Sequence, residues 1–134
     1  MYDPDKCVEE CVFCRIRDGE LQDSFVLDWP LVYAIMSLEQ PNPYKVLVVP
    51  KPHVTTIYEL SDELAAAVFR ATVQVSRAVL AASRCDGMSI VQSNGAAGQQ
   101  DMVLFVGLFE LVHGTCGIVR FLGLMKIVIL NFAP

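Results

Sequence analysis

Two cysteines near the start of the chain have the spacing of a metal-binding pair. Cys11 and Cys14 are separated by two residues, and two thiolates at that spacing can reach one tetrahedral Zn²⁺. There is no second Cys-x-x-Cys, so further ligands must come from elsewhere: His53 is the candidate third, and Cys7 or His113 the candidate fourth. The same pattern also fits two reduced structural thiols and an ordinary loop His, and spacing alone leaves both interpretations open.

His53 has a second possible role. It follows Lys51 and Pro52 at the end of a predicted strand, and His is the usual general acid or base near neutral pH. The chain has only two His, and nothing in the sequence places a nucleophile beside either of them. The residues alone therefore favour a structural or solvated His53 over a catalytic one.

The segment "VQSNGAAGQQ" has the composition of a loop that holds a small anion. Gly98 allows a close approach of the backbone to a ligand, or a positive φ. Side-chain amides can donate to phosphate oxygens without adding charge. The candidate ligand-binding residues of this loop are Gln92, Asn94, Gly98, Gln99 and Gln100. The alternative is a simple connection between two strands.

Composition limits the classes of partner. The 134 residues are 54% hydrophobic, enough to bury the core of one domain, and the formal charge is −5. A chain without a basic run is a poor match for duplex nucleic acid. The acidic start "MYDPDKCVEE" lacks the apolar region of a secretory signal, and the apolar C-terminal stretch is interrupted by Arg120 and Lys126. We therefore expect a cytoplasmic protein without membrane or nucleic-acid partners, and five Cys that are thiols or metal ligands.

The pattern along the chain predicts a single α+β domain over residues 1–134 with a mainly antiparallel sheet. A short helix or turn is expected within 11–20, two strands within 25–36, and further strands at 45–50, 88–92 and 102–109. The strand at 45–50 is nearly continuously apolar, so it should be central. The long helix should begin after the N-cap Ser61 and run to about Ser83. Its predicted apolar stripe comprises Leu64, Val68, Val75 and Val79, widened by Phe69, Thr72 and Leu80.

Three segments resemble one family. "CVFCRIRDGE" is similar to C-x-F-C-x-I-x-x-G-E, "PYKVLVVPKPHV" to P-G-H-x-L-V-x-P-K-x-H, and "GMSIVQSNGAAGQQ" to a segment containing N-x-G-x-x-A-G-Q. These are motifs of the histidine triad (HIT) superfamily, in its HINT-like branch. Their order and spacing agree over residues 11–102.

The resemblance implies a HIT-like fold: a five-stranded, mainly antiparallel sheet, one long helix and a short N-terminal helix, assembled as a homodimer. It implies binding of a purine nucleoside monophosphate and hydrolysis of phosphoramidates or dinucleoside polyphosphates at the α-phosphate through a nucleophilic His. It places Val12, Phe13, Ile16 and Leu38 at the base and ribose, Gln92 and Asn94 near the phosphate, and Gly98, Gln99 and Gln100 in a phosphate loop. It also makes Cys11, Cys14 and His53 zinc ligands.

The sequence departs from the family at the residues that carry the chemistry. The three His of H-x-H-x-H would fall on Val103, Phe105 and Gly107, or, with a one-residue insertion, on Leu104, Val106 and Leu108. Neither register contains His, and the tail 103–134 has diverged. In metal-binding members of the family the first His of the triad is also the fourth zinc ligand, so the resemblance implies that this ligand is lost here. The family's ribose-binding Asp aligns with Ser37. We therefore predict no catalytic residue in this chain and a poorly active nucleotide-binding protein. The alternative is a non-catalytic HIT module that binds nucleotides or proteins.

Overall fold

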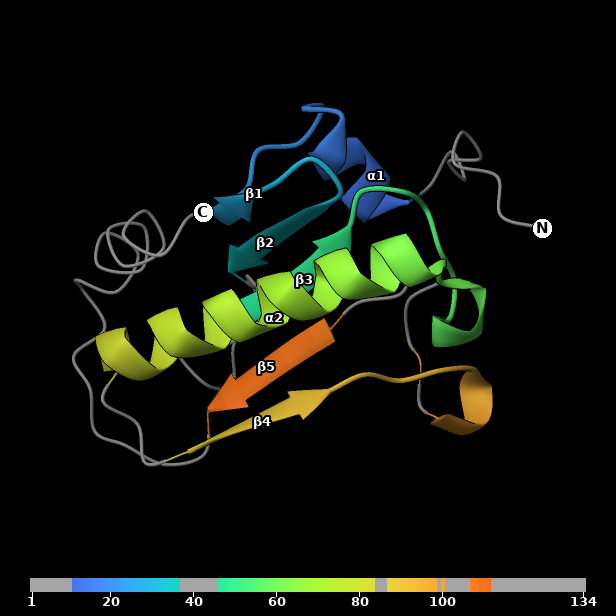
Figure 1. Ribbon diagram of the computed structural model, residues 1–134. Helices are drawn as coiled ribbons and strands as arrows, with labels where there is room; N and C mark the ends of the chain where they lie inside the picture. Colours follow the sequence, from blue (N-terminus) through green and yellow to red (C-terminus); the bar gives the residue numbers. More distant parts are fainter. Residues whose placement is uncertain (1–10, 37–45, 84–86, 99, 101–106, 112–134) are drawn as a thin grey trace.

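The computed structural model describes residues 11–36, 46–83, 87–98, 100 and 107–111 (Figure 1). Residues 107–111, together with residues 83 and 89, are described by their backbone alone. The elements in chain order are α1 (Val12–Arg17), β1 (Phe25–Asp28), β2 (Val32–Met36), β3 (Val46–Pro50), α2 (Asp62–Ser83), β4 (Met88–Val91) and β5 (Gly107–Leu111). Two short 3₁₀ turns, Ile57–Glu59 and Ala96–Gly98, lie in the connections.

The described strands form one sheet in the order β1-β2-β3-β5-β4, and each pairing is antiparallel. β1 and β2 form the predicted hairpin, closed by a hydrogen bond from the Trp29 N–H to the Val32 carbonyl. β3 lies between β2 and β5, as its continuous apolar sequence predicted. The predicted strand at 102–109 appears as β5, which begins at Gly107 and extends to Leu111; residues 101–106 lie outside the described part of the chain.

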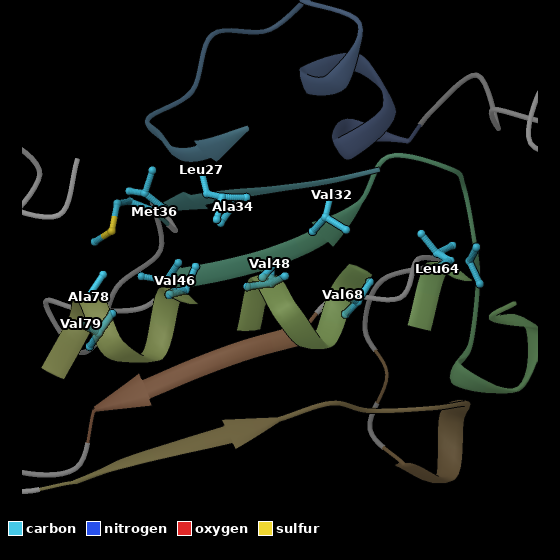
Figure 2. Packing of buried hydrophobic residues seen from close by; sticks show 14 residues of the cluster. Leu27, Val32, Ala34, Met36, Val46, Val48, Leu64, Val68, Ala78 and Val79 are labelled. Atoms are coloured by element: carbon cyan, nitrogen blue, oxygen red, sulfur yellow. The ribbon is translucent and has the colours of Figure 1, made fainter. Parts of the chain in front are cut away.

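Side chains of β2 alternate between two apolar layers, because successive residues of a strand point to opposite faces. Val32, Ala34 and Met36 belong to the cluster that packs against α2 (Figure 2). Tyr33 and Ile35 belong to a second cluster on the face that α1 covers. β2 is therefore buried along its whole length. The α+β class and the long helix on the sheet are confirmed.

Helix α2 begins as predicted and packs against β2 and β3. The hydroxyl of Ser61 accepts a hydrogen bond from the Leu64 N–H at 3.2 Å, which is the N-cap interaction. The predicted stripe of Leu64, Val68, Val75 and Val79 is buried, and so is Thr72. The two other residues assigned to it, Phe69 and Leu80, are 69% and 52% exposed, so that part of the prediction was wrong.

By length and composition alone, residues 62–82 of α2 pass the test for a membrane-spanning helix. The core helix of a globular domain passes the same test. The buried stripe of α2 packs on a sheet, and Arg70 and Arg77 lie on its exposed face. These features are those of a core helix.

Helix α1 ends in a Schellman motif. The Gly19 N–H donates to the Ile16 carbonyl at 3.1 Å, and the Glu20 N–H donates to the Arg15 carbonyl at 2.9 Å. Gly19 has φ +79°, the left-handed conformation that glycine adopts without a steric cost. This motif fixes the direction in which the chain leaves α1 toward β1.

Candidate metal and nucleotide site

The two cysteines of the Cys-x-x-Cys pair and His53 come together in space. Cys14 Sγ lies 3.2 Å from His53 Nδ1, and the ligand atoms of Cys11, Cys14 and His53 all lie within 4.8 Å of one another. Tetrahedral bonds of about 2.3 Å to sulfur and about 2.0 Å to nitrogen place donor atoms roughly 3.5–3.8 Å apart. The three side chains therefore fit one Zn²⁺ ion after movements of about an ångström or less.

Two hydrogen bonds hold α1 in the position that this cluster requires. The buried hydroxyl of Tyr33 on β2 donates to the Phe13 carbonyl at 2.8 Å. Arg17 Nη1 donates to the Lys51 carbonyl at 2.7 Å, two residues before His53. Phe13 and Ile16 are buried against Tyr33, Ile35 and Val49 in the apolar layer under α1. The cysteines are thus fixed to the sheet, and the His to the end of β3.

The electrostatic surroundings favour the ligand form of His53. Burial lowers the pKa of His53, the positive charge of Arg17 lowers it further, and Glu59 acts in the opposite direction. A lowered pKa keeps the imidazole neutral near pH 7, and the neutral ring is the form that coordinates a metal. Burial also raises the pKa of the Tyr33 phenol, so this group remains a protonated donor to Phe13.

Residues 51–60, which we call the strap, run from the cluster to the amide-rich loop. The loop is described for residues 92–98 and 100, and we call these residues the amide loop. The Ile57 N–H donates to Asn94 Oδ1 at 2.7 Å. Gln100 Nε2 donates to the Thr55 carbonyl at 2.6 Å. The strap therefore carries a candidate metal ligand at one end and supports the candidate phosphate loop at the other.

Side-chain amides also hold the amide loop together internally. Gln92 and Asn94 exchange hydrogen bonds: Gln92 Nε2 donates to Asn94 Oδ1 at 3.0 Å, and Asn94 Nδ2 donates to Gln92 Oε1. The Gly95 N–H donates to Gln100 Oε1 at 2.7 Å, while the N–H groups of Gly98 and Gln100 both donate to the Gly95 carbonyl. The predicted ligand-binding amides of Asn94 and Gln100 thus also shape the loop.

The structure places the remaining candidates as follows. Val12 is half-exposed, whereas Phe13 and Ile16 are buried under α1. Leu38, Gln99 and the triad positions 103–106 lie outside the described residues. Gly98 is exposed, and a Cβ added there would meet open space, so the backbone is accessible. The alternative of a positive φ at Gly98 was wrong, because that conformation occurs at Gly95 with φ +72°.

Sequence reasoning missed the residues that join these parts. Thr55 and Ile57 act through their backbone groups, which leave no signature of residue type. Tyr33 lies in an apolar run typical of a core strand. Its hydroxyl, a polar group in that run, was the only sign that it would need a hydrogen-bond partner. Arg17 lies three residues after Cys14, and its contact with Lys51 spans 34 positions of sequence.

A groove of about 910 Å³ lies elsewhere, between the β1–β2 turn and the outer face of α2. Trp29, Leu31 and Phe69 are among its apolar walls, and Arg70 and Arg77 are at its surface. Among the residues that the structure describes, none of the predicted nucleotide or metal residues lines it. We therefore place the candidate site at the cluster and the amide loop, where the polar groups converge.

The sequence pattern of the HIT domain matches residues 18–103. The chain belongs to the HIT domain family. "Protein hit" of Bacillus subtilis is 34% identical over 94 residues, which are 69% of this chain and 65% of that protein. An adenosine 5′-monophosphoramidase, hnt1, of Schizosaccharomyces pombe is 27% identical over 90 residues, which are 67% of this chain and again 65% of the relative. The chain thus matches slightly less than two thirds of each of these relatives.

Solved structures share the HIT-like fold. A HIT family member from Bacillus subtilis has a TM-score of 0.75 at 28% identity, covering 79% of this chain and 75% of that one. A Zn-bound histidine triad family protein from Mycobacterium smegmatis has a TM-score of 0.80 at 17% identity, covering 92% and 95%. At the latter identity the likeness shows the fold alone.

Proposed function

We propose that this HIT-family protein binds a purine nucleoside monophosphate, or a nucleotide that contains one, at the amide loop. The observation that carries the proposal is the anchoring of this loop on the strap, which also carries His53 of the Cys11–Cys14–His53 cluster. The loop is exposed at Gly98, whose N–H donates to the Gly95 carbonyl, and it carries several side-chain amides; amide N–H groups can hold a phosphate without basic side chains. The relative named as an adenosine 5′-monophosphoramidase supports the class of ligand.

Turnover should be slow. Covalent phosphoryl transfer in the family requires a nucleophilic His, and removal of a nucleophile costs several orders of magnitude in rate. The chain's two His are His53, in the metal cluster, and His113, which stands outside both possible registers of the motif. The remaining groups of the amide loop can orient a nucleotide and stabilise charge, but they do not supply the attacking atom.

Zinc is the metal that the donor set fits best, because two thiolates and an imidazole suit it and disfavour hard cations. Cys11, Cys14 and His53 would hold it, and we propose that it serves as a structural crosslink between α1 and the end of β3. The Zn-bound family protein from Mycobacterium smegmatis supports this assignment.

We propose a cytoplasmic homodimer in which two five-stranded sheets join at β4. This strand has a neighbour on one side in the described sheet order. It also exposes Ile90 and Val91, at 53% and 42%. An apolar edge strand is a hazard unless another chain covers it. A second copy of the chain would pair this edge and cover those side chains.

The test compares AMP, adenosine and inorganic phosphate as ligands in thermal unfolding of the zinc-loaded protein. Binding to the native state must raise the melting temperature. At a ligand concentration of 100 times Kd, the free energy of unfolding increases by about 2.7 kcal/mol. We expect AMP to stabilise most. In parallel, hydrolysis of adenosine 5′-phosphoramidate is measured on a sample whose intact mass is verified, and we expect little turnover above background.

The alternative function is a HIT module that binds another protein and no nucleotide. The exposed apolar edge of β4 is the observation that favours it. A native protein that AMP does not stabilise at any concentration would support this alternative. Rapid hydrolysis of the phosphoramidate would contradict this alternative and the expected slow turnover, and it would point to a nucleophile outside the triad registers.

A further inference from the structure

The strap makes polar contacts with two different parts of the site. At its beginning, the Lys51 carbonyl accepts from Arg17, and His53 Nδ1 contacts Cys14 Sγ. Further along, the Thr55 carbonyl accepts from Gln100, and the Ile57 N–H donates to Asn94. The same ten residues are therefore bonded to helix α1 and to the amide loop.

The chain segment between the two sets of contacts is short, and its middle residue is buried. One residue, Val54, separates His53 from Thr55, and this valine is fully buried in the main core cluster. Two residues of extended chain span about 7 Å at most. A displacement of the His53 backbone cannot be absorbed over such a length without moving Val54 or Thr55.

Each contact with the amide loop also closes the loop itself. Gln100 uses one end of its amide to accept from Gly95 and the other to donate to Thr55. Asn94 accepts from Ile57 with the same oxygen that accepts from Gln92. The conformation of the loop therefore depends on where the strap presents Thr55 and Ile57.

We infer that binding of a zinc-class cation by Cys11, Cys14 and His53 orders the amide loop through the strap, so that metal and nucleotide bind cooperatively. Asn94 and Gln100 are the positioning residues of this coupling. The bistable element is the strap together with the loop, which open locally when His53 is released from Cys14. The part of the inference that concerns nucleotide affinity rests on the proposed function. Coupling between two sites commonly amounts to 5–150-fold in affinity, and linkage requires it to be the same in both directions.

The experiment measures hydrogen exchange of the full-length protein by mass spectrometry, with and without Zn²⁺, while zinc content is measured on the same samples. We expect zinc to slow exchange in the peptides that contain Ile57 and Gly95. The double variant Asn94→Ala/Gln100→Glu should still bind zinc but should lose the protection of the Gly95 peptide. Glutamate at position 100 keeps the acceptor for Gly95 and removes the donor to Thr55.

Two further variants separate positioning from general damage. Asn94→Asp keeps the oxygen that accepts from Ile57, so it should retain more of the zinc-dependent protection than Asn94→Ala. Gln74→Ala removes an amide from α2, away from the strap, and should behave like the wild type. In calorimetric titrations, AMP should bind the wild type at least about fivefold more tightly with zinc than without it.

The outcomes distinguish this inference from the proposed function. Bound zinc with unchanged exchange in the amide loop would overturn the inference, and so would the absence of zinc binding. Equal AMP affinity with and without bound zinc would overturn it as well. Zinc-dependent protection of the loop without any AMP binding would uphold the coupling of metal to loop and would refute the nucleotide proposal.

Discussion

Cys14 and His53 are 39 positions apart in the sequence, and their Sγ and Nδ1 atoms lie 3.2 Å from each other. The contact joins helix α1 to the strap that leaves β3. It brings together a Cys-x-x-Cys pair and a His that no local pattern connects. An imidazole in contact with a thiol, with a second thiol within 4.8 Å, offers three of the four donors that a tetrahedral zinc site uses.

Replacement of Cys14 should abolish zinc binding. We expect the wild type to bind one equivalent of zinc and Cys14→Ser to bind none, because serine is not a comparable zinc ligand. Stabilisation by zinc at 100 times Kd is worth about 2.7 kcal/mol, or roughly 10 °C in melting temperature for a domain of this size. Zinc content by elemental analysis and melting with and without a chelator measure both effects.

Cys85→Ser is the matched control, because it removes a thiol that does not belong to the Cys-x-x-Cys pair. It should keep its zinc, and chelation should lower its melting temperature as it does that of the wild type. Equal zinc content in Cys14→Ser and Cys85→Ser would rule out the cluster as the metal site.

The hydrogen bond between Tyr33 and Phe13 should contribute measurably to stability. Tyr33→Phe removes the buried donor and leaves the Phe13 carbonyl without it, which costs about 1–2 kcal/mol. Urea unfolding measures the loss, and the looser α1 should also weaken zinc binding. Tyr58→Phe makes the same chemical change at a side chain that is 84% exposed, and it should change stability by less than about 0.5 kcal/mol. Equal effects of the two variants would show that the Tyr33 contact is not formed.

The sequence predicted the parts of the fold that depend on periodicity. The N-cap Ser61 and the buried stripe of α2 follow from the 3.6-residue repeat, and the central position of β3 follows from its continuous apolar run. Phe69 and Leu80 were misassigned because they lie roughly 110–130° around the helix axis from the centre of the stripe, at 100° per residue. Hydrophobicity alone does not distinguish a core residue from an exposed apolar one.

The sequence predicted only those parts of the candidate site that are formed by side chains. Cys11, Cys14 and His53 were selected by type and spacing, and the structure brings them together. The strap contacts were not predictable, because the Thr55 carbonyl and the Ile57 N–H are present whatever the residue. The ligand-binding roles of Asn94 and Gln100 remain predictions, and their contacts with the strap add a positioning role.

A negative charge at Gly98 should weaken binding of a phosphate. The position is exposed, and an added Cβ meets nothing within 4 Å, so Gly98→Asp should leave the fold intact. Like charges about 4 Å apart repel by about 1 kcal/mol even in bulk water and by more near a protein surface, so AMP affinity should fall about tenfold or further. Gly98→Asn has the same shape without the charge. If the two variants bind AMP equally well, the phosphate does not lie at this loop.

Gly95, in contrast, should tolerate no side chain without a loss of stability. Its φ of +72° is the left-handed conformation, which costs a residue with a Cβ about 1–2 kcal/mol, although a Cβ would meet no neighbouring atom. Gly95→Ala should therefore lower the free energy of unfolding by about 1 kcal/mol. Gly98→Ala, which lacks this backbone constraint, should be neutral. Urea unfolding of both variants checks the difference.

Because Gly95 donates to Gln100 and accepts from Gly98, the strained variant should also show faster hydrogen exchange across the amide loop. Equal stability of the two variants would show that the loop adopts another conformation at Gly95.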